Sequence, residues 1–274
     1  RQVALANLAQ AFGGETTARQ RESLAKSVFG NLARIPFEIG WSMKWTEKDC
    51  LRHFDVRGKE RIQAVLQKRR GLLILTGHMG NWEMLPPMAL LLGVPVTTTY
   101  RPIKFAPADT FFLQLRSRFG SRMVPKKKAM RKILRALADG EAVCLLFDQT
   151  SLKSTGAFVD FFGRKAWTNT GLALLALKTG APVLPAFVVR DGDRFRVEVG
   201  EEIPLVNTGD KHRDVLENTV RCNQALERII RRYPDQWFWV HNRWKARSQS
   251  KARAEDRPAA DGRDSKFQIQ DSRF

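Results

Sequence analysis

The sequence predicts an α/β protein with a central mixed, largely parallel sheet, flanked by helices and preceded by a helical lead-in. Continuous apolar runs at 71–75 and 142–147 are typical of strands buried on both faces, as in a parallel sheet. Segments with apolar residues at helical spacing stand between such runs. Two further runs, 182–190 and 194–199, flank Asp191-Gly192-Asp193, a turn sequence that predicts a hairpin and therefore an antiparallel pair in the sheet.

The other elements follow from the same patterns along the chain. Residues 1–45 are expected to be helical, with a helix cap at Thr16 or Thr17. Helices are also expected at 59–70, 84–93, 109–119, 125–137, 168–179 and 211–233, strands at 54–58 and 94–100, and a loop over 150–167.

Three regions are expected from this pattern. Residues 1–52 form a helical lead-in packed on the core, and 53–245 form the main domain. Residues 246–274 have hardly any apolar side chains and are expected to be a disordered basic tail. Aromatic residues such as Phe37 and Trp41 are dense in the lead-in. They indicate either packing against the main domain or a surface for an acyl chain or a membrane.

The stretch Thr76-Gly77-His78-Met79-Gly80-Asn81-Trp82-Glu83 follows the first buried strand. Ligands of α/β proteins bind in the crevice at the carboxyl ends of the strands, and loops there can carry reactive side chains. Four residues separate His78 from Glu83, a gap short enough for the carboxylate to reach one imidazole nitrogen. Such a bond fixes the tautomer and stabilises the imidazolium that forms when the other nitrogen takes a proton. The pair is a candidate general base, although a histidine near a glutamate also arises by chance.

Other residues at the same edge of the sheet can assist this chemistry. Gly77 and Gly80 suit a backbone that needs positive φ or close approach, and the following helix start can hold negative charge on a substrate oxygen. Asp148 and Gln149 stand at the carboxyl end of the run 142–147 and are expected to face the same crevice. Asp148 is a second acid near His78, a contact for the acceptor, or a helix or turn cap.

The charge balance implies an anionic partner. The chain has 274 residues with 47 Lys and Arg against 28 Asp and Glu, a net charge of +19, so nucleic acid, an anionic membrane or an acidic protein would all fit. The helix expected at 125–137 carries six cations and meets no acid until Asp139. This excess favours docking of an acidic carrier protein or of anionic headgroups over a merely solvated face.

Cysteine usage and hydropathy limit the classes further. Cys50, Cys144 and Cys222 are widely separated, which predicts a reducing compartment and argues against structural zinc, so no metal is expected. No apolar run approaches the roughly 20 residues needed to span a bilayer. The chain begins with Arg1 instead of Met, which indicates a processed or truncated product.

The motif Gly77-His78-Met79-Gly80-Asn81-Trp82-Glu83 resembles the His-x4-Asp/Glu motif of the bacterial lipid A biosynthesis acyltransferase family, which is related more distantly to glycerolipid acyltransferases. The resemblance extends in the family's order over Asn7-Leu8, Ala11-Phe12, Phe147-Asp148-Gln149, Phe161-Phe162-Gly163, Thr170-Gly171, Thr179-Gly180-Ala181-Pro182-Val183, Pro234-Asp235-Gln236-Trp237-Phe238-Trp239-Val240-His241 and Arg243-Trp244-Lys245. It therefore covers nearly everything from Arg1 to about Lys245.

This resemblance implies a glycerolipid acyltransferase-like fold and an O-acyltransferase activity. A fatty acyl chain would move from an acyl thioester, on acyl carrier protein or CoA, to a hydroxyl of a lipid A precursor or related glycolipid. His78 would remove the hydroxyl proton and Glu83 would orient the imidazole, with no serine or cysteine nucleophile and no cofactor.

The resemblance also implies where the protein works. Relatives usually carry an amino-terminal hydrophobic anchor, so we expect the cytoplasmic face of the bacterial inner membrane, with peripheral attachment or an anchor missing from this chain. The expected partners are acyl carrier protein, an anionic lipid membrane and the lipid acceptor, without nucleic acid. The oligomeric state is left open.

An arginine is expected to hold the acceptor phosphate or the oxyanion, because its planar fork matches such oxygens. Relatives carry an arginine in the helix that corresponds to the one containing Arg116, which makes it the first candidate. Arg164 and Arg101 are further candidates, and Asp148 and Gln149 complete the predicted substrate-binding set. With the resemblance in view, the Trp-rich segment that starts at 237 is expected to be a buried strand with a basic rim.

Two competing interpretations remain at this point. A lysophospholipid or other glycolipid acyltransferase would use the same dyad on a different acceptor. A non-enzymatic basic protein that binds nucleic acid or membranes would explain the charge, although the sequence contains no recognised nucleic-acid module.

Overall fold

The computed structural model describes residues 1–127 and 129–245, and Arg1–Trp244 form one compact unit. The predicted disordered tail at 246–274 lies outside the described residues. The boundary predicted between the lead-in and the main domain stays a prediction.

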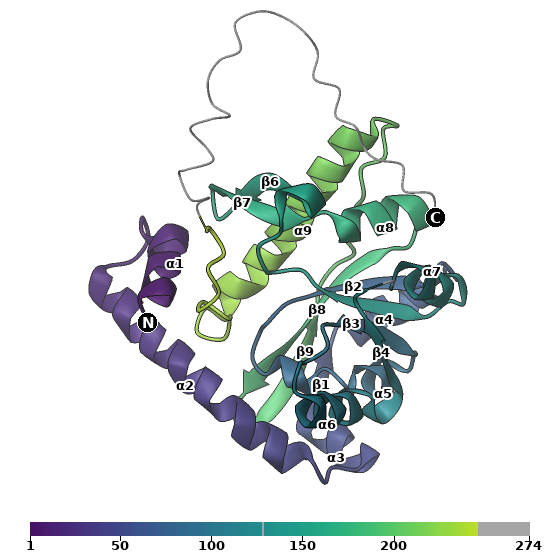
Figure 1. Cartoon of the computed structure of the whole chain (residues 1–274), viewed down its shortest axis with the longest axis horizontal. Helices are drawn as coiled ribbons and strands as arrows, with labels where there is room; N and C mark the ends of the chain where they lie inside the picture. Colours follow the sequence, from purple (N-terminus) through teal and green to yellow (C-terminus); the bar gives the residue numbers. More distant parts are fainter. Residues whose placement is uncertain (128, 246–274) are drawn as a thin grey trace, which may run out of the picture. The chain divides into compact units, whose positions relative to one another are not determined.

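Most of the unit is regular secondary structure (Figure 1). The helices are α1 (Gln2–Phe12), α2 (Ala18–Ser42), α3 (Glu47–His53), α4 (Lys59–Leu66), α5 (Met88–Leu92), α6 (Ala106–Arg116), α7 (Met130–Ala138), α8 (Gly171–Thr179) and α9 (Lys211–Arg232), with short 3-10 turns η1 (Trp82–Met84), η2 (Arg118–Gly120) and η3 (Lys153–Thr155). The strands are β1 (Phe54–Arg57), β2 (Leu72–Thr76), β3 (Val96–Tyr100), β4 (Ser121–Pro125), β5 (Ala142–Leu146), β6 (Gly156–Phe161), β7 (Arg164–Asn169), β8 (Val183–Asp191) and β9 (Arg194–Val199).

The predicted α/β fold with a mixed, largely parallel sheet is confirmed. Seven strands form one sheet in the order β1-β9-β8-β2-β5-β3-β4, and β8 with β9 is its antiparallel pair. Strand β2 lies between β8 and β5 and is parallel to both. Its carboxyl end, where the loop containing His78 begins, is therefore at the middle of the sheet.

The central strands are buried on both faces, which explains their continuous apolar runs. Leu73 and Leu75 of β2 belong to the core cluster that includes residues of α7, α8 and α9. Leu72 and Ile74 point to the opposite face and belong to the cluster that includes residues of α3, α4 and α5. Successive side chains of β2 thus point to opposite faces of the sheet and contribute to two hydrophobic clusters. Helices packed on both faces hold the central strands in place.

The lead-in is helical, as predicted. Thr17 caps α2 in a reciprocal capping box with Gln20, and the helix continues through Pro36 to Ser42. In Figure 1, α2 runs as one long helix from α1 to α3. Within residues 1–127 and 129–245, every helix is too short or too polar for a membrane span.

Two element predictions were wrong, and one strand was missed. The region 150–167, expected to be a loop, contains an antiparallel hairpin of β6 and β7 whose turn residues Phe162 and Gly163 both have positive φ. The edge strand β4 was not predicted, because it is only five residues long and its burial does not alternate from residue to residue. The segment that starts at Trp237 is not a strand: it consists of turns, with one isolated bridge between Trp237 and Met79.

Candidate active site

His78 and Asp148 come together because their strands are neighbours in the sheet. The Phe147 amide donates to the carbonyl of Thr76 at 2.9 Å, so β2 and β5 end side by side. His78 Nδ1 lies 2.8 Å from Asp148 Oδ1, and the His78 amide donates to Asp148 Oδ2 at 2.9 Å. A Cβ on Gly77 would lie 3.1 Å from Asp148 Cγ, so glycine at this position permits the close approach.

The surroundings of Asp148 fix its orientation and that of the imidazole. The buried indole of Trp237 donates to Asp148 Oδ2 at 2.9 Å, which leaves Oδ1 to accept from His78. Asp148 is 2% exposed, whereas the His78 side chain is 16% exposed. With Nδ1–H given to the carboxylate, Nε2 carries the lone pair. That nitrogen lies 3.5 Å from the side-chain nitrogen of the exposed Gln149.

Electrostatics of the pair favour an ionised Asp148 and a basic His78. Burial lowers the pKa of His78, but the charge of Asp148 and its hydrogen bond outweigh burial and hold that pKa above its usual 6.5. Burial raises the pKa of Asp148, yet the charge and hydrogen bonds of His78 and the indole of Trp237 hold it below 3.8. The imidazole can therefore accept a proton at Nε2 while a carboxylate stabilises the cation that forms.

The predicted hydrogen bond between Glu83 and His78 was wrong. Glu83 forms a two-pronged ion pair with Arg116 of α6, with Nε to Oε2 at 2.8 Å and Nη2 to Oε1 at 2.6 Å. Asp148 already occupies the imidazole Nδ1, and the planar guanidinium matches both oxygens of Glu83. Glu83 still influences His78 without touching it: the negative charge of Glu83 raises the pKa of the imidazole. The positive charge of Arg116 lowers that pKa.

Only some of the predicted substrate-binding residues lie near His78. Arg116 lies close enough to influence His78, but Glu83 occupies its Nε and Nη2. Arg101 is exposed at the end of β3, two strands from β2, a separation of about 10 Å. Arg164 is exposed at the turn end of the β6–β7 hairpin, and no contact among the described residues joins it to His78. The roles of Arg116, Asp148, Gln149, Arg101 and Arg164 in substrate binding stay predictions.

The cysteines are poor candidates for a nucleophile. Burial raises the pKa of Cys144 and of Cys222 to about 12, and that of Cys50 to about 11. All three side chains are buried thiols at neutral pH. The thiolate that would be needed for attack on an acyl donor is therefore disfavoured.

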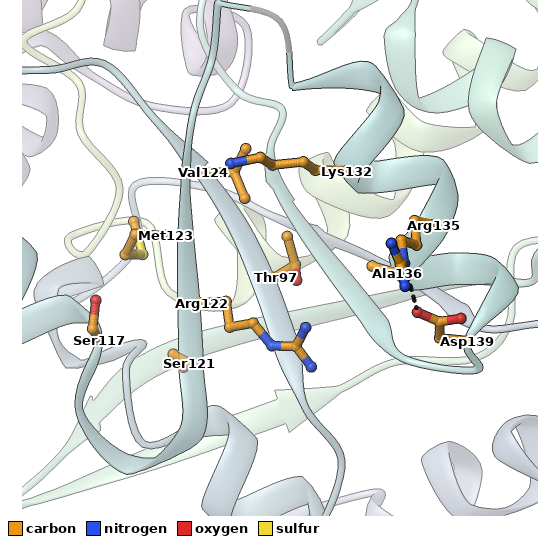
Figure 2. A pocket seen from close by; sticks show the side chains of 10 residues that line it. All are labelled: Thr97, Ser117, Ser121, Arg122, Met123, Val124, Lys132, Arg135, Ala136 and Asp139. Carbon is orange, nitrogen blue, oxygen red and sulfur yellow. Dashed lines mark ion pairs between the residues drawn. The ribbon is translucent and has the colours of Figure 1, made fainter.

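A separate hollow of about 470 Å³ lies between β4 and α7 and does not include His78 (Figure 2). Figure 2 shows Lys132 and Arg135 of α7 and Arg122 and Val124 of β4 among the side chains that line this hollow, with the Arg135–Asp139 ion pair marked. Its lining includes the cations Arg122, Lys132 and Arg135, the last two from the basic segment 125–137.

A comparison with protein families identifies the class of enzyme. The model of the bacterial lipid A biosynthesis acyltransferase family matches residues 1–246. The chain belongs to this family. The resemblance in the sequence is thereby confirmed, and the protein is an acyltransferase. The competing interpretation as a non-enzymatic basic protein is set aside.

Curated relatives of this acyltransferase share about a quarter of its residues. A lipid A biosynthesis palmitoleoyltransferase of Escherichia coli is 27% identical over 84% of this chain and 74% of its own length. A lipid A biosynthesis lauroyltransferase of the same organism is 27% identical over 86% and 76%. A phosphatidylinositol mannoside acyltransferase of Mycolicibacterium smegmatis is 26% identical over 73% and 65%.

Several residues around the site were missed by sequence reasoning. Trp237 was known only as part of an aromatic segment, and its bond to Asp148 spans 89 positions. Asn81, Glu38 and Arg190 form a buried polar group behind the loop that carries His78. The sequence offers no local signal for such contacts, because they depend on how α2 and β8 meet.

Proposed function

We propose that the acyltransferase moves a fatty acyl chain from an acyl thioester to a hydroxyl of a lipid A precursor or related glycolipid, with His78 as general base. The supporting observation is the His78–Asp148 pair, which fixes Nδ1 and leaves Nε2 as the acceptor. The names of the relatives support the acceptor class, because they are enzymes of lipid A or of phosphatidylinositol mannoside acylation.

In the proposed reaction, the acceptor hydroxyl gives its proton to His78 Nε2 as its oxygen attacks the thioester carbonyl. Asp148 stabilises the resulting imidazolium. The tetrahedral intermediate then breaks its C–S bond, and the leaving thiolate takes the proton from Nε2. An ester and a free thiol result, and no acyl group is attached to the protein.

The donor we propose is acyl carrier protein, an acidic partner. Its docking surface would be the exposed cations of β4, α7 and the turn between them, Arg122, Lys126, Lys127, Arg131, Lys132 and Arg135. Among the described residues, Arg122 pairs with Glu141 and Arg135 with Asp139, whereas Lys132 forms no ion pair. Figure 2 shows Lys132 beside the hollow next to β4. Such a surface attracts an acidic partner before docking.

Purified protein given acyl carrier protein thioester and a lipid A precursor should form one ester for each thiol released, and the mass of the protein itself should not change.

Lys132→Glu should lower kcat/KM about tenfold with the carrier protein and leave it nearly unchanged with an acyl-pantetheine, which is uncharged. The matched control is Lys59→Glu, an exposed lysine of α4. Equal losses with both donors would contradict docking at α7, and absence of product with either donor would contradict the proposed reaction.

We also propose peripheral contact with an anionic membrane through the end of α2 and the turn after it. Phe37 is 78% exposed, Trp41 47% and Met43 51%, with the exposed cations Lys44 and Lys48 nearby. Aromatic side chains enter the headgroup region while adjacent lysines meet anionic lipids. In a sedimentation assay, the protein should pellet with vesicles that contain phosphatidylglycerol. The double variant Phe37→Ser, Trp41→Ser should lower the bound fraction several-fold. Unchanged binding of that variant would rule out this surface.

A further inference from the structure

A buried ion pair joins the lead-in helix α2 to the central sheet behind the active site. Arg190 of β8 donates from Nε to Glu38 Oε1 at 2.6 Å and from Nη2 to Glu38 Oε2 at 2.7 Å. Arg190 Nη2 also donates to the carbonyl of Asn31 at 3.0 Å. The Glu38 side chain is 10% exposed and that of Arg190 4%, so neither charge is solvated by bulk water.

Besides Arg190 and, at 3.5 Å, Arg34 Nε, the Glu38 carboxylate contacts the loop that carries His78 and Glu83. Asn81 is fully buried, and its side-chain amide donates to Glu38 Oε2 at 2.9 Å. The other end of the same amide accepts from the backbone N–H of Glu83 at 3.1 Å, which caps the turn η1. One side chain thus connects a carboxylate of α2 to the backbone of the residue that holds Arg116.

The loop is also pressed against β8 itself. Gly80 has φ +54°, and a Cβ at this position would lie 2.6 Å from the carbonyl oxygen of Val188. The Gly80 amide donates to the carbonyl of Gln236, whose side chain pairs with the backbone of Arg190 through bonds of 2.7 and 3.1 Å. The loop is therefore joined to the segment around Arg190 at Gly80, through Gln236, and at Asn81, through Glu38.

The buried Glu38–Arg190 pair is expected to add little to the stability of the fold. The attraction between two buried charges is largely cancelled by the free energy needed to remove them from water. Its geometric effect is specific: Arg190 holds the carboxylate, and the carboxylate orients the Asn81 amide so that its oxygen faces the Glu83 N–H. An amide without this partner could turn over and present its NH2 group to that N–H.

We propose that Glu38 is a positioning residue for acyl transfer, which acts through Asn81 on the turn that carries Glu83. The proposal rests on the proposed role of His78 and extends it to residues that touch neither substrate nor the imidazole. Displacement of Glu83 moves the Glu83–Arg116 pair relative to His78, whose proton affinity both charges influence. The reacting groups would then meet in a poorer geometry, which lowers kcat more than it weakens substrate binding.

The decisive variant is Asn81→Ser, which retains a capping oxygen for the Glu83 N–H and removes the side-chain NH2 group that donates to Glu38. Its kcat should fall about 10- to 100-fold, with KM for either substrate changed less than about threefold. The matched control is Asn218→Ser. Asn218 is also fully buried, and both ends of its amide are bonded, here to the backbone of Val206, away from the loop. The control should lose comparable thermal stability but little kcat.

A double-mutant cycle tests whether Glu38 acts through Asn81. Glu38→Gln should lower kcat in the wild-type background but add little further loss in the Asn81→Ser background. Glu38→Gln leaves a buried arginine without its counter-ion and can lower the folded fraction of the protein. Its kcat is therefore calculated per folded molecule. If that variant does not fold, Asn81→Ser against Asn218→Ser still decides the matter.

Hydrogen exchange supplies a readout that does not depend on catalysis. Amides of 77–84 should exchange at least about tenfold faster in Asn81→Ser than in wild type, and at the wild-type rate in Asn218→Ser. Wild-type exchange and kcat in Asn81→Ser, or equal loss of kcat in both variants, would overturn the positioning role. A third outcome separates the two proposals. If the amides of 77–84 exchange faster in Asn81→Ser while His78→Ala remains fully active, Glu38 and Asn81 position the loop, but His78 is not the general base.

Discussion

Replacement of His78 by alanine should lower kcat for acyl transfer about 10²- to 10⁴-fold, the usual contribution of a positioned general base. The side chain is partly exposed at a strand end and lies outside both core clusters, so the variant should fold normally. The acceptor hydroxyl would then have no group at hydrogen-bond distance to take its proton. Initial rates with saturating donor and acceptor, together with a thermal melt, measure both expectations.

The control for this replacement is His212→Ala, an exposed histidine on α9. It should retain the wild-type kcat, because it lies away from the strand ends that form the site. A His78→Ala protein that folds and turns over at the wild-type rate would exclude proton removal by this side chain.

Asp148→Asn should be almost as damaging, although it changes only one group at nearly constant volume. Asparagine can present its NH2 group to His78 Nδ1, which would leave the ring proton on Nε2, where the acceptor must deliver its own. Without the carboxylate, the imidazolium also loses its counter-charge. We expect kcat to fall about 10²- to 10⁴-fold.

The pH dependence separates this role from a loss of folding. The base must be neutral to accept a proton, so activity rises with pH through the pKa of His78, which lies above 6.5 in the wild type. Asp148→Asn removes the charge and the hydrogen bond that raise this pKa and leaves burial, which lowers it. The acid limb of the kcat profile should therefore move to lower pH in the variant. A limb that stays in place, or moves to higher pH, would show that Asp148 does not control His78.

The fold was predictable where the sequence has a strong local period. Strands β2 and β5 were found because both faces are buried and leave continuous apolar runs, and the β8–β9 hairpin because a turn sequence separates two such runs. The β6–β7 hairpin was missed, because the exposed apolar side chain of Phe158 breaks the alternation of apolar and polar residues along β6, and the turn residues Phe162 and Gly163 are not a common hairpin signal.

The site was predictable in its members and less so in its pairings. His78 and Asp148 were both named because each follows a buried strand, but only the parallel pairing of β2 with β5 decides that they touch. Glu83 was assigned to His78 by their closeness in sequence, whereas its partner is Arg116, 33 positions away. The contact between Glu38 and Arg190 spans 152 positions and has no signal in either segment alone.

One measurement tests the central claim most directly. Lipids are extracted from bacteria that produce either the intact chain or its His78→Ala variant at equal protein level, and both are analysed by mass spectrometry. Our account predicts that a lipid A precursor or related glycolipid gains one acyl chain only in cells with the intact protein. A gain on lysophospholipid would place the same dyad on another acceptor. Identical gains with both proteins would contradict catalysis by His78.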